Sequence, residues 1–168
     1  MIKNLIIRNA ELGDAMAIAD IYNHFVLHSI ATFDEELITE EIIKQRIELT
    51  QKSKVFLSCL VHDELVGYAY ASDWKIKSAY RFTVETTIYL KPDFAGKGIG
   101  KMLYMELLKQ LSEKGFKVAI GGISIPNPAS IALHENLGFI QVAHFKNVGF
   151  KFNNWIDVGY WQLNLTGF

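Results

Sequence analysis

The sequence predicts an α/β protein in which a mixed β-sheet is covered by helices on both faces. Segments with helical spacing of apolar residues and segments of alternating or β-branched residues follow one another in the order β-α-α-β-β-β-α-β-α-β-β. The chain has 168 residues, of which 50% are apolar, and this is the size of one domain with a substantial core. We therefore expect a single domain over residues 1–168.

The first half of the chain is expected to form two helices and then three strands. Asp14 is the expected N-cap of the first helix, whose apolar stripe covers residues 18–26, and the second helix is expected over residues 39–52. Strands are expected at residues 55–61, 65–72 and 81–90. Alternation in the third strand places Val84 on one face and Glu85 on the other.

A glycine-rich segment leads into the second half of the chain. Gly96, Gly98 and Gly100 precede a helix with a leucine stripe, and this helix is expected to end at Gly115. Next come a strand at residues 117–121, a short helix at 127–136 and strands at 139–148 and 158–165. No repeat, low-complexity tract or long linker interrupts this order.

Net charge and cysteine content exclude several classes of partner and site. Seventeen Lys and Arg against eighteen Asp and Glu give a net charge of -1, which argues against duplex nucleic acid or an anionic membrane surface as partner. Cys59 is the only cysteine, so we expect no disulfide and no thiolate metal site, and its place in a strand indicates a buried apolar residue. No apolar run approaches the ~20 residues of a membrane span, and we expect a cytoplasmic protein without a metal.

The strongest chemical signal lies in residues 84–114. Glycines let backbone N–H groups point into one concavity, and the helix that follows adds its positive end, so this unit can bind phosphate without net positive charge. The loop is not a Walker loop, because Ala95 and Met102 stand where Gly and Ser or Thr are needed. Lys101 likewise excludes the dinucleotide fingerprint, which needs a small residue there. A structural turn is the alternative for the loop alone.

Two blocks of the sequence resemble the GNAT acetyltransferases. Their pyrophosphate loop is written Q/R-x-x-G-x-G/A at the start of a helix, and Ala95, Gly98 and Gly100 match it except at the basic first position. Residues 127–139 resemble the second block, in which an Asn opens a helix and a Gly-Phe pair closes it. The chain also resembles, over nearly its whole length, the phosphinothricin and methionine-sulfone N-acetyltransferases. The landmarks are Tyr22-Asn23-His24, residues 29–33, 67–71, 79–81 and 84–89, Gly149-Phe150-Lys151 and residues 155–163.

The resemblance implies an activity and the residues that perform it. It implies transfer of the acetyl group of acetyl-CoA to the α-amine of a small amino-acid-like acceptor by a homodimer. Glu85 matches the proposed general base of that group, and a Glu desolvated toward a pKa of ~6–7 can take the proton of an amine. Either His134 or Tyr104 is expected to protonate the leaving thiolate. One alternative is that Glu85 forms a structural ion pair with Arg81 or a neighbouring Lys. The other is that His134 is a helix His bonded near Glu135 or Gly138.

The same resemblance assigns residues to the two substrates. The backbone of residues 88–90 is expected to pair with the pantetheine arm as an extra strand and to polarise the thioester carbonyl. The donor site is expected to comprise Ile88, Tyr89, Leu90, Gly96, Lys97, Gly98, Ile99, Gly100, Lys101, Asn127 and Ser130. Three cations within residues 75–81 suit an anionic acceptor, unless they belong to a solvated loop. The acceptor site is expected to comprise Phe33, Lys75, Lys77, Tyr80, Arg81, Glu85, Thr86 and Thr87.

Two other functions stay open on the sequence. An acetyltransferase for another amine, such as a general amino acid, a polyamine, an aminoglycoside or a protein N-terminus, would use the same donor loop. A polycation would need an acidic pocket, which the cations of residues 75–81 argue against. A non-catalytic acyl-CoA sensor would also keep the donor loop but would not need Glu85 and His134.

Overall fold

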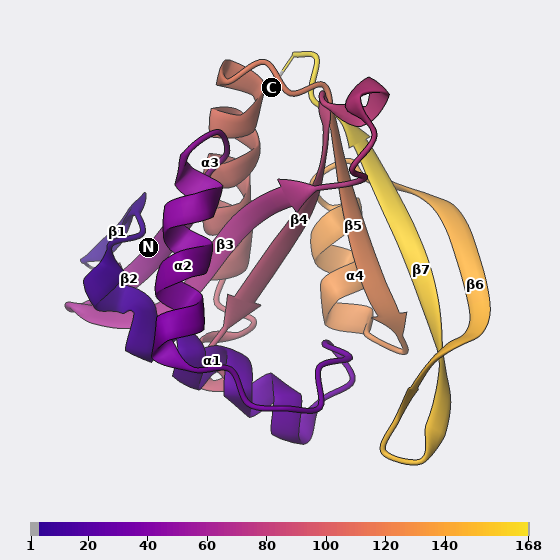
Figure 1. Cartoon of the computed structure of the whole chain (residues 1–168), viewed down its shortest axis with the longest axis horizontal. Coiled ribbons are helices and arrows are strands. Elements are labelled where there is room, and N and C mark those ends of the chain that lie inside the picture. Colours follow the sequence, from indigo (N-terminus) through magenta and orange to yellow (C-terminus); the bar gives the residue numbers. More distant parts are fainter. Residues whose placement is uncertain (1–3, 168) are drawn as a thin grey trace.

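The computed structural model describes residues 4–167, and its centre is one seven-stranded sheet (Figure 1). In spatial order the strands are β1 (Leu5–Asn9), β2 (Phe56–Val61), β3 (Glu64–Asp73), β4 (Thr83–Leu90), β5 (Val118–Ile125), β7 (Asn154–Asn164) and β6 (Ile140–Lys151). Only β4 and β5 are parallel, and the other described neighbours are antiparallel. The predicted mixed sheet is confirmed.

Different helices cover the two faces of the sheet (Figure 1). The helices are α1 (Ala15–His28), α2 (Glu40–Gln51), α3 (Ile99–Glu113) and α4 (Pro128–Glu135). Ile18 of α1 and Ile43 of α2 share one buried apolar cluster with Phe56 of the sheet. Leu107 of α3 shares a second cluster with Val84 of β4. Helices therefore lie on both faces, as the sequence predicts, and no helix within residues 4–167 is long and apolar enough to cross a membrane.

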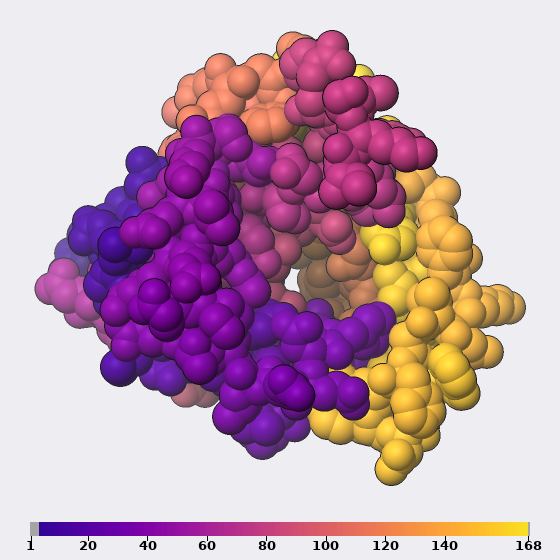
Figure 2. Space-filling model, viewed as in Figure 1, coloured from indigo at the N-terminus to yellow at the C-terminus, as the bar shows by residue number. Residues whose placement is uncertain are grey.

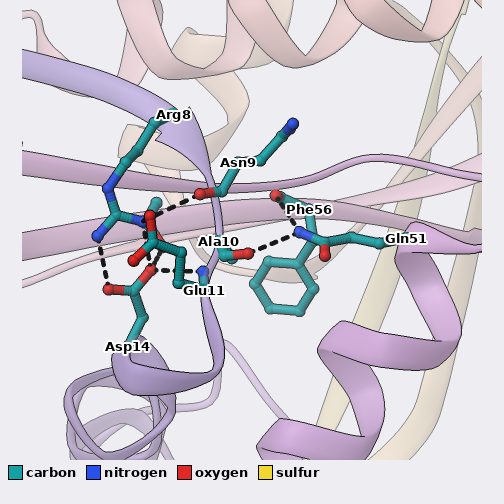
Figure 3. A network of polar contacts seen from close by, with 8 residues as sticks. Arg8, Asn9, Ala10, Glu11, Asp14, Gln51 and Phe56 are labelled. Atoms are coloured by element: carbon teal, nitrogen blue, oxygen red, sulfur yellow. Dashed lines mark hydrogen bonds and ion pairs between the residues drawn. The ribbon is translucent and has the colours of Figure 1, made fainter.

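A polar network ties the start of α1 to the sheet (Figure 3). The Asp14 carboxylate accepts hydrogen bonds from Arg8 at 2.7 and 2.8 Å, from the Glu11 backbone N–H at 2.9 Å and from the Ser58 hydroxyl at 2.7 Å. Burial opposes ionisation of Asp14, but these hydrogen bonds outweigh it and hold its pKa below the usual range. Asp14 stands at the N-cap position of α1, as the sequence predicts, but its side chain bonds to these partners and makes no capping hydrogen bond to the helix.

The last two strands are longer than predicted. They form one hairpin, which turns at Phe152 and Asn153 with φ values of 52° and 58°. The sequence predicts a gap over residues 149–157, because the turn holds no glycine and the flanking residues do not alternate clearly. Asn tolerates the left-handed conformation, which makes the tight turn possible.

The sheet splits between its two parallel strands. The parallel ladder joins residues 83–85 of β4 to residues 118–120 of β5 and then stops. Beyond it, β4 continues to Leu90 beside β3, whereas β5 continues to Ile125 beside β7. Figure 1 shows the two strands separating toward their carboxyl ends. Ligands of α/β sheets bind at such divergences, so this split is where the site is sought.

Candidate active site

Two cavities open at the split and share one wall. The hairpin cavity, of about 480 Å³, lies between residues 30–33, β5 and the β6–β7 hairpin. The glycine-loop cavity, of about 510 Å³, lies between β4, the glycine loop and α4. Figure 2 shows the molecule hollowed between the purple α1–α2 segment and the yellow hairpin. Ala31, Glu85, Gly122 and Ser124 line both cavities and form the shared wall.

Glu85 projects from β4 into the shared wall. Burial raises the pKa of its carboxyl group, and the charge of Lys75 partly opposes this. Within the described residues no ion pair joins Glu85 to Arg81 or to a lysine. The Arg81 guanidinium instead donates to the Ser78 carbonyl at 3.2 Å. The structure therefore offers no counterpart to the ion pair considered as an alternative.

Two adjacent glycines of β5 make room for functional side chains on opposite faces of the strand. A Cβ at Gly121 would collide with the His134 imidazole. A Cβ at Gly122 would lie 3.2 Å from Glu85 Oε1 and 3.2 Å from the Tyr160 ring. Adjacent glycines inside a central strand mark close approaches of this kind, so the pair is a sequence signal for the site that the motifs above do not include.

A chain of hydrogen bonds runs from the glycine-loop cavity into the core. Thr86 Oγ1 lies 2.6 Å from the Tyr104 hydroxyl, which lies 3.0 Å from His134 Nε2. At the two ends, His134 Nδ1 lies 2.8 Å from the Ser130 carbonyl oxygen and Thr86 Oγ1 lies 3.2 Å from the Ile120 carbonyl oxygen. Thr86 and His134 line the cavity, whereas Tyr104 is fully buried behind them and lines neither cavity.

The Ser130 and Ile120 carbonyl groups at the two ends of this hydrogen-bonded chain determine the direction in which its members donate hydrogen bonds. The Ser130 oxygen only accepts, so His134 Nδ1 carries a proton in every state. Neutral His134 accepts at Nε2 from Tyr104, which accepts from Thr86. Protonated His134 donates to Tyr104, Tyr104 donates to Thr86, and Thr86 donates to the Ile120 oxygen. Both ring nitrogens and both hydroxyl groups are hydrogen-bonded in either state, so the imidazole can gain or lose a proton without moving the heavy atoms.

Burial decides which member of this chain changes its protonation. Desolvation lowers the pKa of His134, and the hydrogen bond to the Ser130 carbonyl opposes the shift. Desolvation also raises the pKa of Tyr104 far above the physiological range, although its bond to Thr86 acts the other way. Tyr104 therefore keeps a proton throughout, and His134 is the group that titrates.

The glycine-loop cavity presents backbone groups to a ligand. Residues 86–90 of β4 pair with β3 along one edge, and no strand of the described chain pairs with their other edge. Gly96 and Gly98 have φ values of 71° and 81°, which side chains rarely adopt, and the space around both is open. Gly98 is the N-cap of α3, so the positive end of this helix faces the loop.

Most residues expected at the donor site line this cavity. They are Ile88, Tyr89, Leu90, Gly96, Gly98, Gly100, Lys101, Asn127 and Ser130. Lys97 and Ile99 do not, because Lys97 Nζ lies over the Phe94 ring, 5.2 Å from its centroid, and Ile99 is buried in the core. Asn127 also caps α4, since its Oδ1 accepts from the Ser130 N–H at 3.1 Å. The lining residues that sequence reasoning missed are Phe25, Ala31, Ala95, Gly122, Ile123, Ser124, Ala129, Ala132, Leu133 and Asn136.

The hairpin cavity has mostly apolar walls. Its lining residues, all within the described chain, are Ile30, Ala31, Phe33, Glu85, Gly122, Ser124, Phe145, Val148, Val158 and Tyr160. Only Glu85, Ser124 and Tyr160 among them carry polar side-chain atoms. Apart from Phe33 and Glu85, none of these residues was expected, because spacing in the sequence gives no sign that the hairpin folds back over β5.

The residues expected at the acceptor site are divided by the structure. Phe33 and Glu85 line the hairpin cavity, and Thr86 and Thr87 line the glycine-loop cavity. The residues that line neither cavity are Lys75, Lys77, Tyr80 and Arg81. Lys75 is linked to the hairpin cavity through Trp74: its Nζ lies 4.5 Å from the centroid of the Trp74 ring, which packs 5.3 Å from the ring of Tyr160. The other three belong to an exposed segment around the short helix of residues 78–80.

A buried lysine holds one wall of the hairpin cavity in place. Lys151 is 2% exposed, and its Nζ donates to the Ser29 carbonyl at 3.0 Å and to the Thr32 carbonyl at 2.9 Å. Beside it, the Phe33 ring packs on Gly149, where any Cβ would collide with the ring. These contacts fix the segment between α1 and α2 against β6.

The fold and the site together define a GNAT-type N-acetyltransferase. The structure matches that of an acetyltransferase of Salmonella typhimurium, solved with its cofactor acetyl-CoA, with a TM-score of 0.95 and 34% identity, covering 99% of this chain and 96% of that one. A family model described as an acetyltransferase (GNAT) domain matches residues 7–159. The chain belongs to this family, and it is an enzyme of the acetyltransferase class.

The names of two relatives support the narrower resemblance as well. The phosphinothricin N-acetyltransferase of Streptomyces viridochromogenes is 36% identical over 93% of this chain and 85% of its own length. The L-methionine sulfoximine/L-methionine sulfone acetyltransferase of Salmonella typhimurium is 36% identical over 95% of this chain and 94% of its own length. The resemblance drawn from the sequence blocks is thereby confirmed.

Proposed function

We propose that the protein transfers the acetyl group of acetyl-CoA to the α-amine of a small amino-acid-like acceptor, of the phosphinothricin, methionine sulfoximine or methionine sulfone type. The observation that carries the proposal is the position of Glu85 in the wall shared by two cavities. One cavity can hold a donor while the other holds an acceptor, with a desolvated carboxylate between them. The names of the relatives above support the acceptor class, and the Salmonella structure with bound acetyl-CoA supports the donor.

The glycine-loop cavity suits acetyl-CoA as donor. Gly96, Gly98 and Gly100, with the first turn of α3, would hold the pyrophosphate through backbone N–H groups. Lys101 lines the cavity and would replace the basic residue of the motif, at whose position this chain has Ala95. The free edge of residues 86–90 would pair with the pantetheine arm and supply an N–H for the oxyanion of the tetrahedral intermediate.

Glu85 acts in this proposal as the general base for direct transfer. The bound ammonium group gives one proton to the carboxylate, and the amine nitrogen then attacks the thioester carbonyl carbon. The C–S bond of the tetrahedral intermediate breaks next, and the nitrogen releases its second proton to water as the amide forms. The raised pKa of Glu85 brings its basicity closer to the working pH. No acetyl-cysteine step is invoked, because Cys59 is fully buried, lines neither cavity, and has its pKa raised by burial to about 11.

The hydrogen-bonded chain serves the leaving thiolate. The Thr86 hydroxyl turns from the Ile120 carbonyl toward the CoA sulfur and gives it a proton. Thr86 then takes the Tyr104 proton, and Tyr104 takes the Nε2 proton of protonated His134. This assigns the acid to His134 and a relay role to Tyr104, the two residues between which the sequence leaves the choice open. Thr86 and His134 both line the cavity, and Thr86 is the one of the two hydroxyl groups of the relay that does so.

Acceptors with a neutral side chain are expected to react best. The walls of the hairpin cavity are apolar, and its only charged lining residue within the described chain is Glu85, which repels an anion. We expect kcat/KM for L-methionine sulfone to exceed that for phosphinothricin, whose side chain is an anionic phosphinate, by about tenfold or more. Thiol release from acetyl-CoA, measured over a panel that also includes L-methionine sulfoximine, spermidine and an alanyl peptide, tests both the activity and this order.

Two outcomes of that panel would overturn the proposed function. If spermidine or the peptide were the best acceptor, the enzyme would be an acetyltransferase for another class of amine. If acetyl-CoA bound but no amine released thiol, the chain would be an acyl-CoA sensor. A preference for phosphinothricin would contradict only the expected order of acceptors. It would show that cationic side chains of the protein reach the hairpin cavity.

We also propose that two copies of the chain associate through the β6–β7 hairpin. β6 is an edge strand, and exposed apolar side chains cover the hairpin, namely Ile140, Val142, Phe150, Phe152 and Trp155. A large apolar surface of this kind is typical of homodimer interfaces. We expect light scattering to give twice the 19.1 kDa chain mass and Trp155→Lys to shift the protein toward monomer. A monomeric wild type would contradict the dimer.

A further inference from the structure

Ser124 of β5 carries a buried hydroxyl group that is not hydrogen-bonded within the described residues. The residue is 8% exposed. The only other such side-chain atom in the described chain is the hydroxyl of Tyr68, which lies in the core and lines neither cavity. Ser124, in contrast, lines both cavities. Because buried hydroxyl groups are almost always bonded, an unpaired one in a ligand cavity indicates a group that binds the ligand.

The register of the sheet places Ser124 on the same face as the proposed base. Glu85 pairs with Ile120 across the parallel ladder, and every second residue of β5 shares that face, which gives Gly122 and then Ser124. Glu85 Oε1 lies against Gly122, 3.2 Å from where its Cβ would be. The next same-face position is one two-residue step farther along the strand, about 6–7 Å away. One nitrogen can bond to groups on both sides of such a gap, because each bond spans about 2.9 Å.

The neighbours of Ser124 assign it to the acceptor rather than the donor. It pairs with Val158 of β7, and Gly122 pairs with Tyr160. Val158 and Tyr160 line the hairpin cavity but not the glycine-loop cavity. The hydroxyl therefore stands where an acceptor in the hairpin cavity extends its amino group toward the donor.

We infer that the Ser124 hydroxyl is a binding group of the acceptor site, which holds the acceptor amine opposite Glu85. The inference rests on the proposed transfer to an amine. When Glu85 removes one proton, the Ser124 oxygen accepts a hydrogen bond from a remaining N–H and leaves the nitrogen lone pair directed at the thioester. No motif of the sequence marks Ser124, because its role depends on the split between β4 and β5.

Kinetics of Ser124→Ala and Ser124→Cys test this role, with L-methionine sulfone as acceptor. Both variants are expected to lose about 10- to 100-fold in kcat/KM for the acceptor, as for a lost hydrogen bond to a charged group, while KM for acetyl-CoA stays at the wild-type value. The cysteine variant keeps the volume of the side chain, so an equal loss in both assigns the effect to hydrogen bonding. Thermal stability is expected to stay equal or to rise, because an unpaired buried hydroxyl is removed.

Ser112→Ala is the matched control. Its hydroxyl donates to the Leu165 carbonyl at 3.0 Å and lies in neither cavity, so its kinetics should equal those of the wild type. Wild-type kcat/KM in Ser124→Ala, or a rise confined to KM for acetyl-CoA, would overturn the inference. A wild-type enzyme that acetylates no amine would instead overturn the proposed function, so the two failures are distinguishable.

Discussion

Replacement of Glu85 by Gln is expected to lower kcat about 10²- to 10⁴-fold while acetyl-CoA still binds, because the amine then has no general base. Gln has the shape of Glu, so it fits the space beside Glu85 Oε1 that Gly122 leaves open by having no Cβ. Initial rates at saturating acetyl-CoA and acceptor give kcat, and titration of acetyl-CoA gives its binding constant.

Glu48→Gln provides the matched control for this substitution. Glu48 is exposed on α2, away from both cavities, and its change to Gln should leave kcat unaltered. Turnover at the wild-type rate by the Glu85 variant would show that the amine loses its proton elsewhere. Loss of acetyl-CoA binding would show that Glu85 shapes the donor site instead.

The same variant carries an expectation for stability. The pKa of Glu85 is raised in the folded protein, so the folded state favours the protonated carboxyl group, and this contribution is lost as the pH rises through the folded pKa. At neutral pH the charged carboxylate therefore lowers the stability of the free enzyme. The Gln variant, neutral at every pH, should melt at the wild-type temperature or above it. A variant that folds with undiminished stability but has lost its activity would indicate that Glu85 is buried for catalysis and not for stability.

Replacement of His134 by Ala is expected to lower kcat about 10²- to 10³-fold, because the thiolate then leaves without a proton donor. His134 has both ring nitrogens bonded, to Ser130 and to Tyr104, so its proton reaches the cavity through Thr86. Thr86→Val keeps the shape of the side chain, removes that hydroxyl, and should lower kcat by a comparable factor. Thiol release at saturating substrates measures each effect.

Two further variants separate the relay from a packing role. Tyr104→Phe interrupts the chain in the middle and should resemble Thr86→Val, whereas Thr86→Ser restores the hydroxyl and should restore most of the rate. His28→Ala, on the exposed end of α1, is the control and should leave kcat unchanged. A wild-type rate in Thr86→Val beside a slow His134→Ala would show that the imidazole acts on the thiolate directly.

The donor side of the site could be predicted from the sequence because its parts are local. A glycine loop, the helix behind it and the strand before it are continuous in the chain. Gly98 and Gly100 of the motif line the cavity, together with Lys101, which follows them directly. Glu85 could be assigned to the opposite face from Val84 by alternation alone. Such features follow from backbone periodicity and turn chemistry, which act within a few residues.

The acceptor side could not be predicted because it depends on contacts between distant segments. Ser124 and Tyr160 enter the hairpin cavity only because β5 leaves β4 and pairs with β7. Lys77 and Arg81, expected there from their charge, fall on an exposed segment instead. Tyr104, expected as one of two candidate acids for the thiolate, is buried behind His134. Helical spacing indicates which face of α3 it lies on but not what covers that face.

The pH dependence of kcat for the wild type and for Glu85→Gln tests the central claim most directly. If Glu85 takes the proton of the bound ammonium, wild-type kcat should fall on the acid side with an apparent pKa above the ordinary Glu value, because burial raises the pKa of this group. In the Gln variant that acid-side limb should disappear, whereas the fall of kcat at higher pH, where His134 loses the proton that it supplies to the thiolate, should be common to both proteins. Superimposable profiles for the two proteins would contradict the account.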